Sequence, residues 1–273
     1  MQESQFSKTA LVTCLMRAIH TRLDRPRHLD DSWGDRLLLE SERAAFGSEA
    51  RLRASAAYGM VILRTRYTEE ALSAAVANVI LGAGMDTFAL RRPDFANDVV
   101  VIEVDHPASQ SFKRERLRAC GVSIPRNLHF LAVDLSREAL PAALSRSPYR
   151  RTEPAFFSWL GVAAYLTREA NLATLRGIAD CAVADSEIVF TYLDERELEA
   201  PPRSVEAVRT AAAGLGEPWV SGFNPTTLEQ ELSPIGLRMI EDLSGDDIWR
   251  RYCTEGEVTL RSPTVRIARA HVA

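Results

Sequence analysis

Apolar residues in the first third of the chain recur every three or four positions, which is the period of a helix with one buried face. Two further helical stretches are predicted over residues 35–46 and 49–76. We expect these helices to pack together as an N-terminal cap over residues 1–76. The clearest periodic set is Ala10, Leu11, Cys14, Leu15, Ala18 and Ile19.

From residue 79 onward, short apolar runs alternate with amphipathic helices. Near-continuous hydrophobic runs are typical of strands buried on both faces of a parallel sheet. After a Pro- and Gly-rich insertion at about 195–236, which we expect to cover a substrate, the alternation resumes with LRMIEDL and a two-part strand from Val258 to Val272. The earlier runs are VILGAG, VVVIEVD, LHFLAVD, PAFFSWL and EIVFTYL.

Residues 77–273 therefore predict an α/β fold with a Rossmann-like, seven-stranded and mostly parallel sheet. Seven strands, the last pair closing the sheet, fit the class I version of the fold that binds S-adenosylmethionine (SAM) better than the six-stranded dinucleotide version.

Composition narrows the possible partners. The chain of 273 residues carries a net charge of −4, which gives no general attraction to nucleic acid or to anionic membranes. Neither a signal peptide nor an apolar run of about 18 residues is present, so we expect a cytoplasmic protein. The oligomeric state is left open. The four cysteines show no metal-ligand spacing, so no metal is expected; they are Cys14, Cys120, Cys181 and Cys253.

The strongest local signal is the segment VILGAGMDT, a strand that ends in the turn Gly82-Ala83-Gly84. Glycines there let the backbone approach a ligand at the carboxyl end of the first strand. A dinucleotide fingerprint would have Gly where Thr87 stands. A tight turn without any ligand is the alternative.

A carboxylate at the end of the second strand strengthens the case for a nucleoside. Asp105 lies about twenty residues beyond the glycines and can accept hydrogen bonds from both ribose hydroxyls. Glu103 is a competitor on the same face of the strand. Because His106 and Pro107 follow, Asp105 is alternatively a helix cap.

A third acid, Asp134, ends the third strand. Its carboxylate could take an adenine amino group, while the N–H of the adjacent Leu135 reaches a ring nitrogen. Asp134 is alternatively the cap of a helix from Ser136.

These residues carry a resemblance to a known family. VILGAGMDTFALR, VIEVDHPASQSFKRERL, VDL at 133–135, the stretch from Arg64 to Leu72, the opening SKTA and the late GEPW resemble leucine carboxyl methyltransferases. Within that family the chain looks most like bacterial enzymes that esterify polyketide carboxylates in tetracenomycin-type pathways.

The resemblance implies a SAM site. It places Lys8 and Arg64 on the methionine carboxylate beside the Gly82–Gly84 backbone, Asp105 on the ribose, and Asp134 with Leu135 on the adenine. The chemistry agrees for Arg64, which lies mid-helix in an apolar run where a charge needs a partner. The chain departs from the family at Leu160, where relatives carry Glu.

The expected function is transfer of the SAM methyl group to a carboxylate of a small molecule, a polyketide or aromatic acid. An ionised carboxylate is already a nucleophile, so no obligatory base is expected. Tyr192, Trp219 and Phe223 are the pocket candidates, and His106 is expected to start a helix. The alternatives are a protein C-terminal carboxyl methyltransferase, a non-catalytic SAM-binding protein and a dinucleotide-dependent oxidoreductase.

Overall fold

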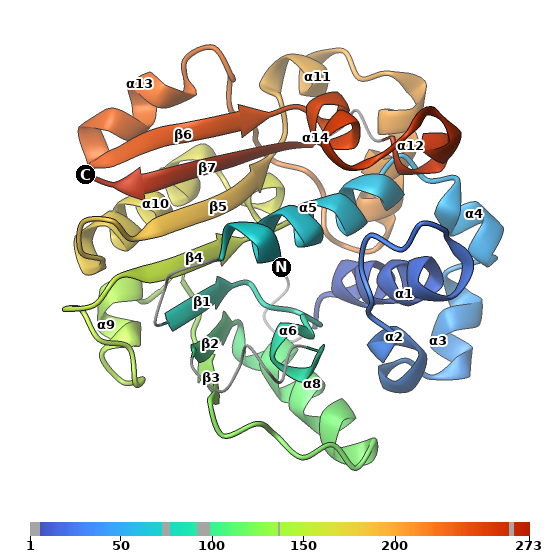
Figure 1. Cartoon of the computed structure of the whole chain (residues 1–273), viewed down its shortest axis with the longest axis horizontal. Coiled ribbons are helices and arrows are strands. Elements are labelled where there is room, and N and C mark those ends of the chain that lie inside the picture. Colours follow the sequence, from blue (N-terminus) through green and yellow to red (C-terminus); the bar gives the residue numbers. More distant parts are fainter. Residues whose placement is uncertain (1–5, 73–76, 92–98, 136, 262–264) are drawn as a thin grey trace.

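The computed structural model describes residues 6–72, 77–91, 99–135, 137–261 and 265–273. A single twisted sheet forms the centre of the molecule, and a group of N-terminal helices lies at one end of it (Figure 1). Among the described residues, no helix is long and apolar enough to span a bilayer.

The sheet has seven strands in the order β3-β2-β1-β4-β5-β7-β6. Strands β1 to β5 pair in parallel, and β7 pairs antiparallel with both β5 and β6. The prediction of a seven-stranded, mostly parallel Rossmann-like sheet is confirmed. The strands are β1 (Ala77–Leu81), β2 (Val100–Asp105), β3 (Leu128–Ala132), β4 (Ala155–Trp159), β5 (Glu187–Tyr192), β6 (Leu237–Leu243) and β7 (Arg266–Val272).

The predicted two-part strand from Val258 to Val272 is wrong in its first part. Residues 255–260 form the 3-10 helix η3, and the strand begins only at Arg266. Glu257 explains the turn, because its carboxylate accepts the backbone N–H of Thr254 at 2.9 Å, and its carbonyl accepts the indole N–H of Trp249 at 3.1 Å. These local bonds compete with strand pairing.

The N-terminal helices are shorter than predicted. They are α1 (Lys8–Leu23), α2 (Trp33–Leu37), α3 (Glu40–Ala45), α4 (Glu49–Arg53) and α5 (Tyr58–Ala71). The stretch 35–46 breaks at Leu39, whose N–H donates to the Glu42 carboxylate at 2.8 Å. The stretch 49–76 breaks between α4 and α5, and residues 73–76 lie outside the described part of the chain.

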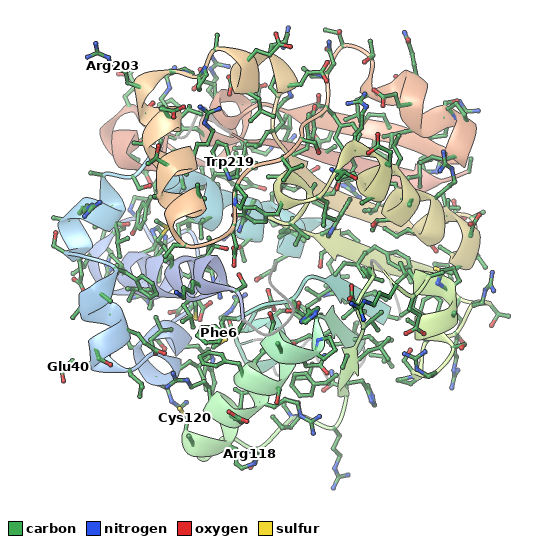
Figure 2. The ribbon with its side chains drawn as sticks, turned by 180° about the vertical axis from the view of Figure 1, so that it is seen from behind. Phe6, Glu40, Arg118, Cys120, Arg203 and Trp219 are labelled. Atoms are coloured by element: carbon green, nitrogen blue, oxygen red, sulfur yellow. The ribbon has the colours of Figure 1, made fainter. Side chains whose placement is uncertain are left out.

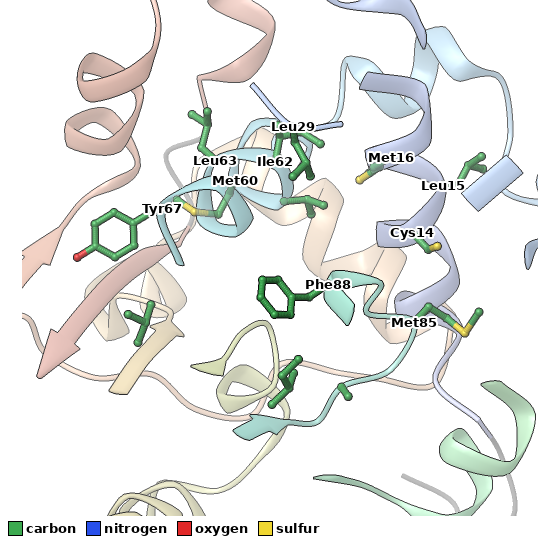
Figure 3. Packing of buried hydrophobic residues seen from close by; sticks show 14 of the residues in the cluster. Cys14, Leu15, Met16, Leu29, Met60, Ile62, Leu63, Tyr67, Met85 and Phe88 are labelled. Carbon is green, nitrogen blue, oxygen red and sulfur yellow. The ribbon is translucent and has the colours of Figure 1, made fainter. Parts of the chain in front are cut away.

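The cap and the sheet share one core. Alternation along β1 sends Ile80 to one face and Val79 with Leu81 to the other. Ile80 joins a cluster with residues of α1 and α5. Figure 3 shows this cluster, to which three separate segments contribute Met16, Met60 and Phe88. Val79 and Leu81 join a second cluster with α9 (Leu140–Leu144) and α10 (Arg168–Cys181).

The other helices connect the strands. Between β5 and β6, where the lid insertion is expected, lie α11 (Glu195–Glu199), α12 (Arg203–Gly214), α13 (Leu228–Leu232) and η2 (Ser233–Ile235). The remaining elements are α6 (Phe88–Arg91), α8 (Pro107–Ala119), η1 (Ala163–Tyr165), α14 (Gly245–Tyr252) and η3 (Glu255–Leu260).

Candidate functional site

A large cavity of about 850 Å³ opens at the carboxyl ends of β1, β2, β4 and β5. This is the edge at which open α/β sheets bind ligands. Helices α1 and α5 line its cap side, and α12 lines the side of the insertion. The volume lies in the range of sites for cofactors and drug-sized molecules.

The glycine turn forms the sheet side of the cavity. Gly82 and Gly84 have φ values of 63° and 50°, in the left-handed region that favours glycine. A Cβ at Gly82 would come within 2.4 Å of Val162, and one at Gly84 within 2.8 Å of Ala10. The turn is therefore held closely between the loop after β4 and helix α1.

Asp105 lines the cavity beside this turn. One carboxylate oxygen accepts the N–H of Gly84 at 2.6 Å, and the other accepts the N–H of His106 at 2.7 Å. Burial raises the pKa of Asp105, while these two backbone donors lower it. Each oxygen keeps a second lone pair with which to accept a further hydrogen bond.

Glu103, the competitor of Asp105, is a structural residue. Its carboxylate is buried and lies 2.5 Å from the ammonium of Lys113. It is absent from the cavity lining. The helix-cap alternative for Asp105 also fails, because His106 is the N-cap of α8 and its Nδ1 accepts the N–H of Ala108 at 3.3 Å.

Arg64 projects from α5 into the cavity. Within the described residues its guanidinium makes no hydrogen bond or ion pair, and burial lowers its pKa to about 10. It remains charged at neutral pH. A Cβ at Gly161 would lie 2.7 Å from a guanidinium nitrogen, so the glycine makes room for the side chain.

The other two predicted contacts are not brought to this cavity. Lys8 is exposed at the first position of α1 and is absent from the lining. Asp134 and Leu135 also lie beyond the lining. The carbonyl of Asp134 starts a turn by accepting the N–H groups of Arg137 and Glu138 at 2.9 and 3.0 Å. Ser136 lies outside the described residues.

The three aromatic residues predicted for the pocket differ in their position relative to the cavity. Trp219 lines the cavity (Figure 2 labels it on the segment after α12). Tyr192 reaches the lining, but its hydroxyl is engaged by Asp242 at 2.8 Å and Arg266 at 3.1 Å. The placement of Phe223 in the pocket was wrong, because this ring is fully buried against Phe190 and Tyr192 and does not line the cavity.

The sequence pattern indicated no functional role for two polar residues that line the cavity. Tyr165 lies in η1, and burial raises the pKa of its hydroxyl. Glu217 follows α12, is 7% exposed and accepts a hydrogen bond from the hydroxyl of Thr9. The GEPW string that contains Glu217 was the only available signal, and it indicated no role.

Outside this cavity, the fold brings together a His-Cys-Glu group that the spacing did not indicate. Cys253 Sγ lies 3.8 Å from His28 Nε2, which also bonds to the carboxylate of Glu257. The direct hydrogen bond between His28 and Glu257 explains why these side chains lie close together.

The fold and this cavity together define a class I Rossmann-like methyltransferase architecture. Two solved structures support the fold. A DUF574 family protein from Streptomyces avermitilis covers 97% of both chains with a TM-score of 0.61 at 13% identity. A protein from Thermobifida fusca, assigned as a methyltransferase, covers 94% of both chains with a TM-score of 0.60 at 14% identity.

The chain belongs to the leucine carboxyl methyltransferase family, whose model matches residues 10–179. YktD of Bacillus subtilis (strain 168), assigned to the S-adenosyl-L-methionine-dependent methyltransferases, is 33% identical over 91% of each chain. A Mycolicibacterium smegmatis protein with the same assignment is 32% identical over 70% of this chain and 68% of its own length.

Proposed function

We propose that this protein transfers the methyl group of SAM to a carboxylate of a small polyketide or aromatic acid. SAM is the cofactor of the family to which the chain belongs. The observation that carries the proposal is the Arg64 guanidinium, which has no hydrogen bond or ion pair in the described part of the chain and lies in the same cavity as the Gly82–Gly84 turn and Asp105. A half-buried cation that forms no ion pair within the described residues is suited to an anionic ligand.

The residues present fit SAM. Arg64 is suited to the methionine carboxylate, because a guanidinium can bind a carboxylate through two parallel hydrogen bonds. The free lone pairs of Asp105 suit the ribose hydroxyls. When bound, SAM supplies an activated methyl group. Contacts of Lys8, Asp134 and Leu135 with SAM stay predictions.

The remainder of the cavity suits an apolar substrate. One face of α12 lines it with small residues, among them Ala207, Val208 and Ala211. Phe46 and Val61 line it from the cap. Such walls favour a flat, ring-bearing molecule. The exposed Arg51, which also lines the cavity, adds positive charge that favours an acid.

The chemistry of a carboxylate substrate fits the side chains around the cavity. None of the described lining residues is a histidine. Burial raises the pKa of Tyr165, which makes it a weaker acid at neutral pH. A carboxylate needs no deprotonation, so alignment with the methyl group and exclusion of water suffice. We place this reaction in the cytoplasm.

Turnover of methyl-labelled SAM with a panel of aromatic and polyketide acids tests the proposal. We expect methyl esters, identified by mass, and a rate that is flat between pH 6 and 8, since a carboxyl group with a pKa of about 4 is ionised throughout. A rate that rises tenfold per pH unit would indicate a hydroxyl acceptor. A peptide that ends in leucine tests the protein substrate, and SAM binding without any turnover would indicate a non-catalytic protein.

A further inference from the structure

We propose that Glu217 binds the α-ammonium group of the methionine part of SAM, and that it thereby joins the insertion to helix α1 around the bound cofactor. The inference rests on the proposed function for the identity of the ligand. It assigns a role to a residue for which the sequence pattern offered none.

The first observation is the burial of an unpaired charge. Glu217 is 7% exposed and lines the cavity, and within the described residues no lysine, arginine or histidine forms an ion pair with it. Its carboxylate accepts a hydrogen bond from the hydroxyl of Thr9. Carboxylates are rarely buried without a cationic partner, so the position calls for a cation from a ligand.

The second observation comes from comparing the partners of the acidic residues that line the cavity. Glu69 pairs with Arg91, and Asp105 accepts two backbone N–H groups. Asp86 accepts the N–H of Phe88 at 2.8 Å and lies near enough to Arg17 to raise the pKa of that guanidinium. Among the described lining residues, Glu217 is the acid that lacks both a cation and a backbone donor.

The third observation is the relation between Glu217 and Arg64. The charges of both side chains act on the hydroxyl of Tyr165, whose pKa is raised by Glu217 and lowered by Arg64. Yet the two charges form no ion pair with each other in the described structure. Two charges of opposite sign, neither in an ion pair within the described residues, lie around one tyrosine and complement a zwitterion. The methionine part of SAM is an α-amino acid with both charges.

The position of Glu217 adds a structural consequence. Its backbone N–H donates to the carbonyl of Ala212 at 3.0 Å, which fixes it to the end of α12. Thr9, its hydrogen-bond donor, belongs to α1 and is 208 residues away in the sequence. Binding of the ammonium would therefore order the contact between the insertion and the cap.

Calorimetry with two ligands tests the proposal. The first ligand is S-adenosylhomocysteine, and the second is its deaminated analogue, in which the amino group is replaced by hydrogen. We expect Glu217→Gln to weaken S-adenosylhomocysteine about ten- to a hundredfold, as for loss of a charged hydrogen bond. The deaminated analogue should bind the variant and the wild type equally.

Glu229→Gln is the matched control, because Glu229 is an exposed acid of the same insertion that does not line the cavity. It should change neither affinity. Equal weakening of both ligands by Glu217→Gln, or no weakening of either, would overturn the proposal. If that variant does not fold, Thr9→Val, which leaves the carboxylate less well held, should weaken only the ligand with the amino group, and equal effects would again overturn it.

The same experiment separates this proposal from the proposed function. If the wild-type protein binds neither ligand, the cofactor assignment fails and Glu217 has no role in it. If the wild type binds both but Glu217→Gln does not discriminate between them, only the ammonium contact is wrong.

Discussion

The two sides of the cavity differ in how their polar groups are satisfied. On the sheet side, Asp105 already accepts the N–H groups of Gly84 and His106. On the helical side, Arg64 and Glu217 form no ion pair within the described residues. Folding therefore provides partners for the carboxylate on the sheet side. We infer that the cofactor provides partners for the two charges on the helical side. Free energy given up in burying these charges is recovered on binding.

Strand β2 shows the same contrast within two residues. Glu103 is closed off by the Lys113 ammonium at 2.5 Å and contributes to the fold. Asp105 stands at the strand end and faces the cavity. The position along the strand, and not the kind of side chain, separates a structural acid from a ligand-binding one.

Glu103→Gln should have the largest effect, and that effect should be on stability alone. The change leaves the Lys113 ammonium buried without an anion, which costs about 3–5 kcal/mol of unfolding free energy. Urea denaturation measures the loss. The SAM dissociation constant of the folded fraction should not change, and a loss of affinity at unchanged stability would put Glu103 in the site.

Asp105→Ala should affect both quantities. SAM binding should lose about 1.5–3 kcal/mol with the charged acceptor, and the fold about 1–3 kcal/mol because two backbone N–H groups lose their partner. Calorimetry and denaturation measure the two losses. Asp134→Ala is the comparison variant, with a milder effect on SAM. An unchanged dissociation constant in Asp105→Ala would remove this residue from the cofactor site.

Arg64→Leu should have the opposite effect to Glu103→Gln: it should weaken cofactor binding without lowering the stability of the fold. We expect S-adenosylhomocysteine to bind about ten- to a hundredfold more weakly, while 5′-methylthioadenosine, which lacks the amino-acid part, binds as before. The melting temperature of the free protein should stay the same or rise. Equal weakening of both ligands would show that Arg64 is structural.

The pH dependence of stability shows whether the charge of Arg64 stabilises or destabilises the folded protein. Burial lowers the pKa of Arg64 to about 10, well below the ordinary value of a guanidinium, so the unfolded chain binds this proton more tightly. The charged guanidinium thus destabilises the folded protein below pH 10, and the penalty is relieved as pH rises above 10. Arg64→Leu should remove this penalty at neutral pH.

His106→Ala should have the smallest effect. It removes the acceptor for the N–H of Ala108 and costs about 0.5–1 kcal/mol of stability, as for other N-caps. Turnover should stay within about tenfold, short of the roughly 10²–10⁴-fold loss typical of a general base. A larger loss of rate would transfer His106 from the helix start to the chemistry.

The sequence by itself determined the parts that depend on neighbours along the chain. Near-continuous apolar runs marked the strands from β1 to β6, and the paired glycines marked the turn at Gly82–Gly84. The same local reasoning placed Asp105 at a strand end and indicated that Arg64, mid-helix among apolar residues, requires a partner. Side-chain period and strand direction are local properties, so these inferences needed no tertiary contact.

Only the tertiary structure decided which side chains meet. It buried Phe223 in the core, engaged the Tyr192 hydroxyl with Asp242, and turned residues 255–260 into a 3-10 helix. It also brought Glu217 to Thr9 across 208 residues. Whether a charge lies exposed, is paired, or is buried without a partner depends on what packs against it from distant segments. The periodicity of the sequence does not encode which charges are paired in this way. The proposed cofactor contacts of Arg64 and Glu217 depend on it.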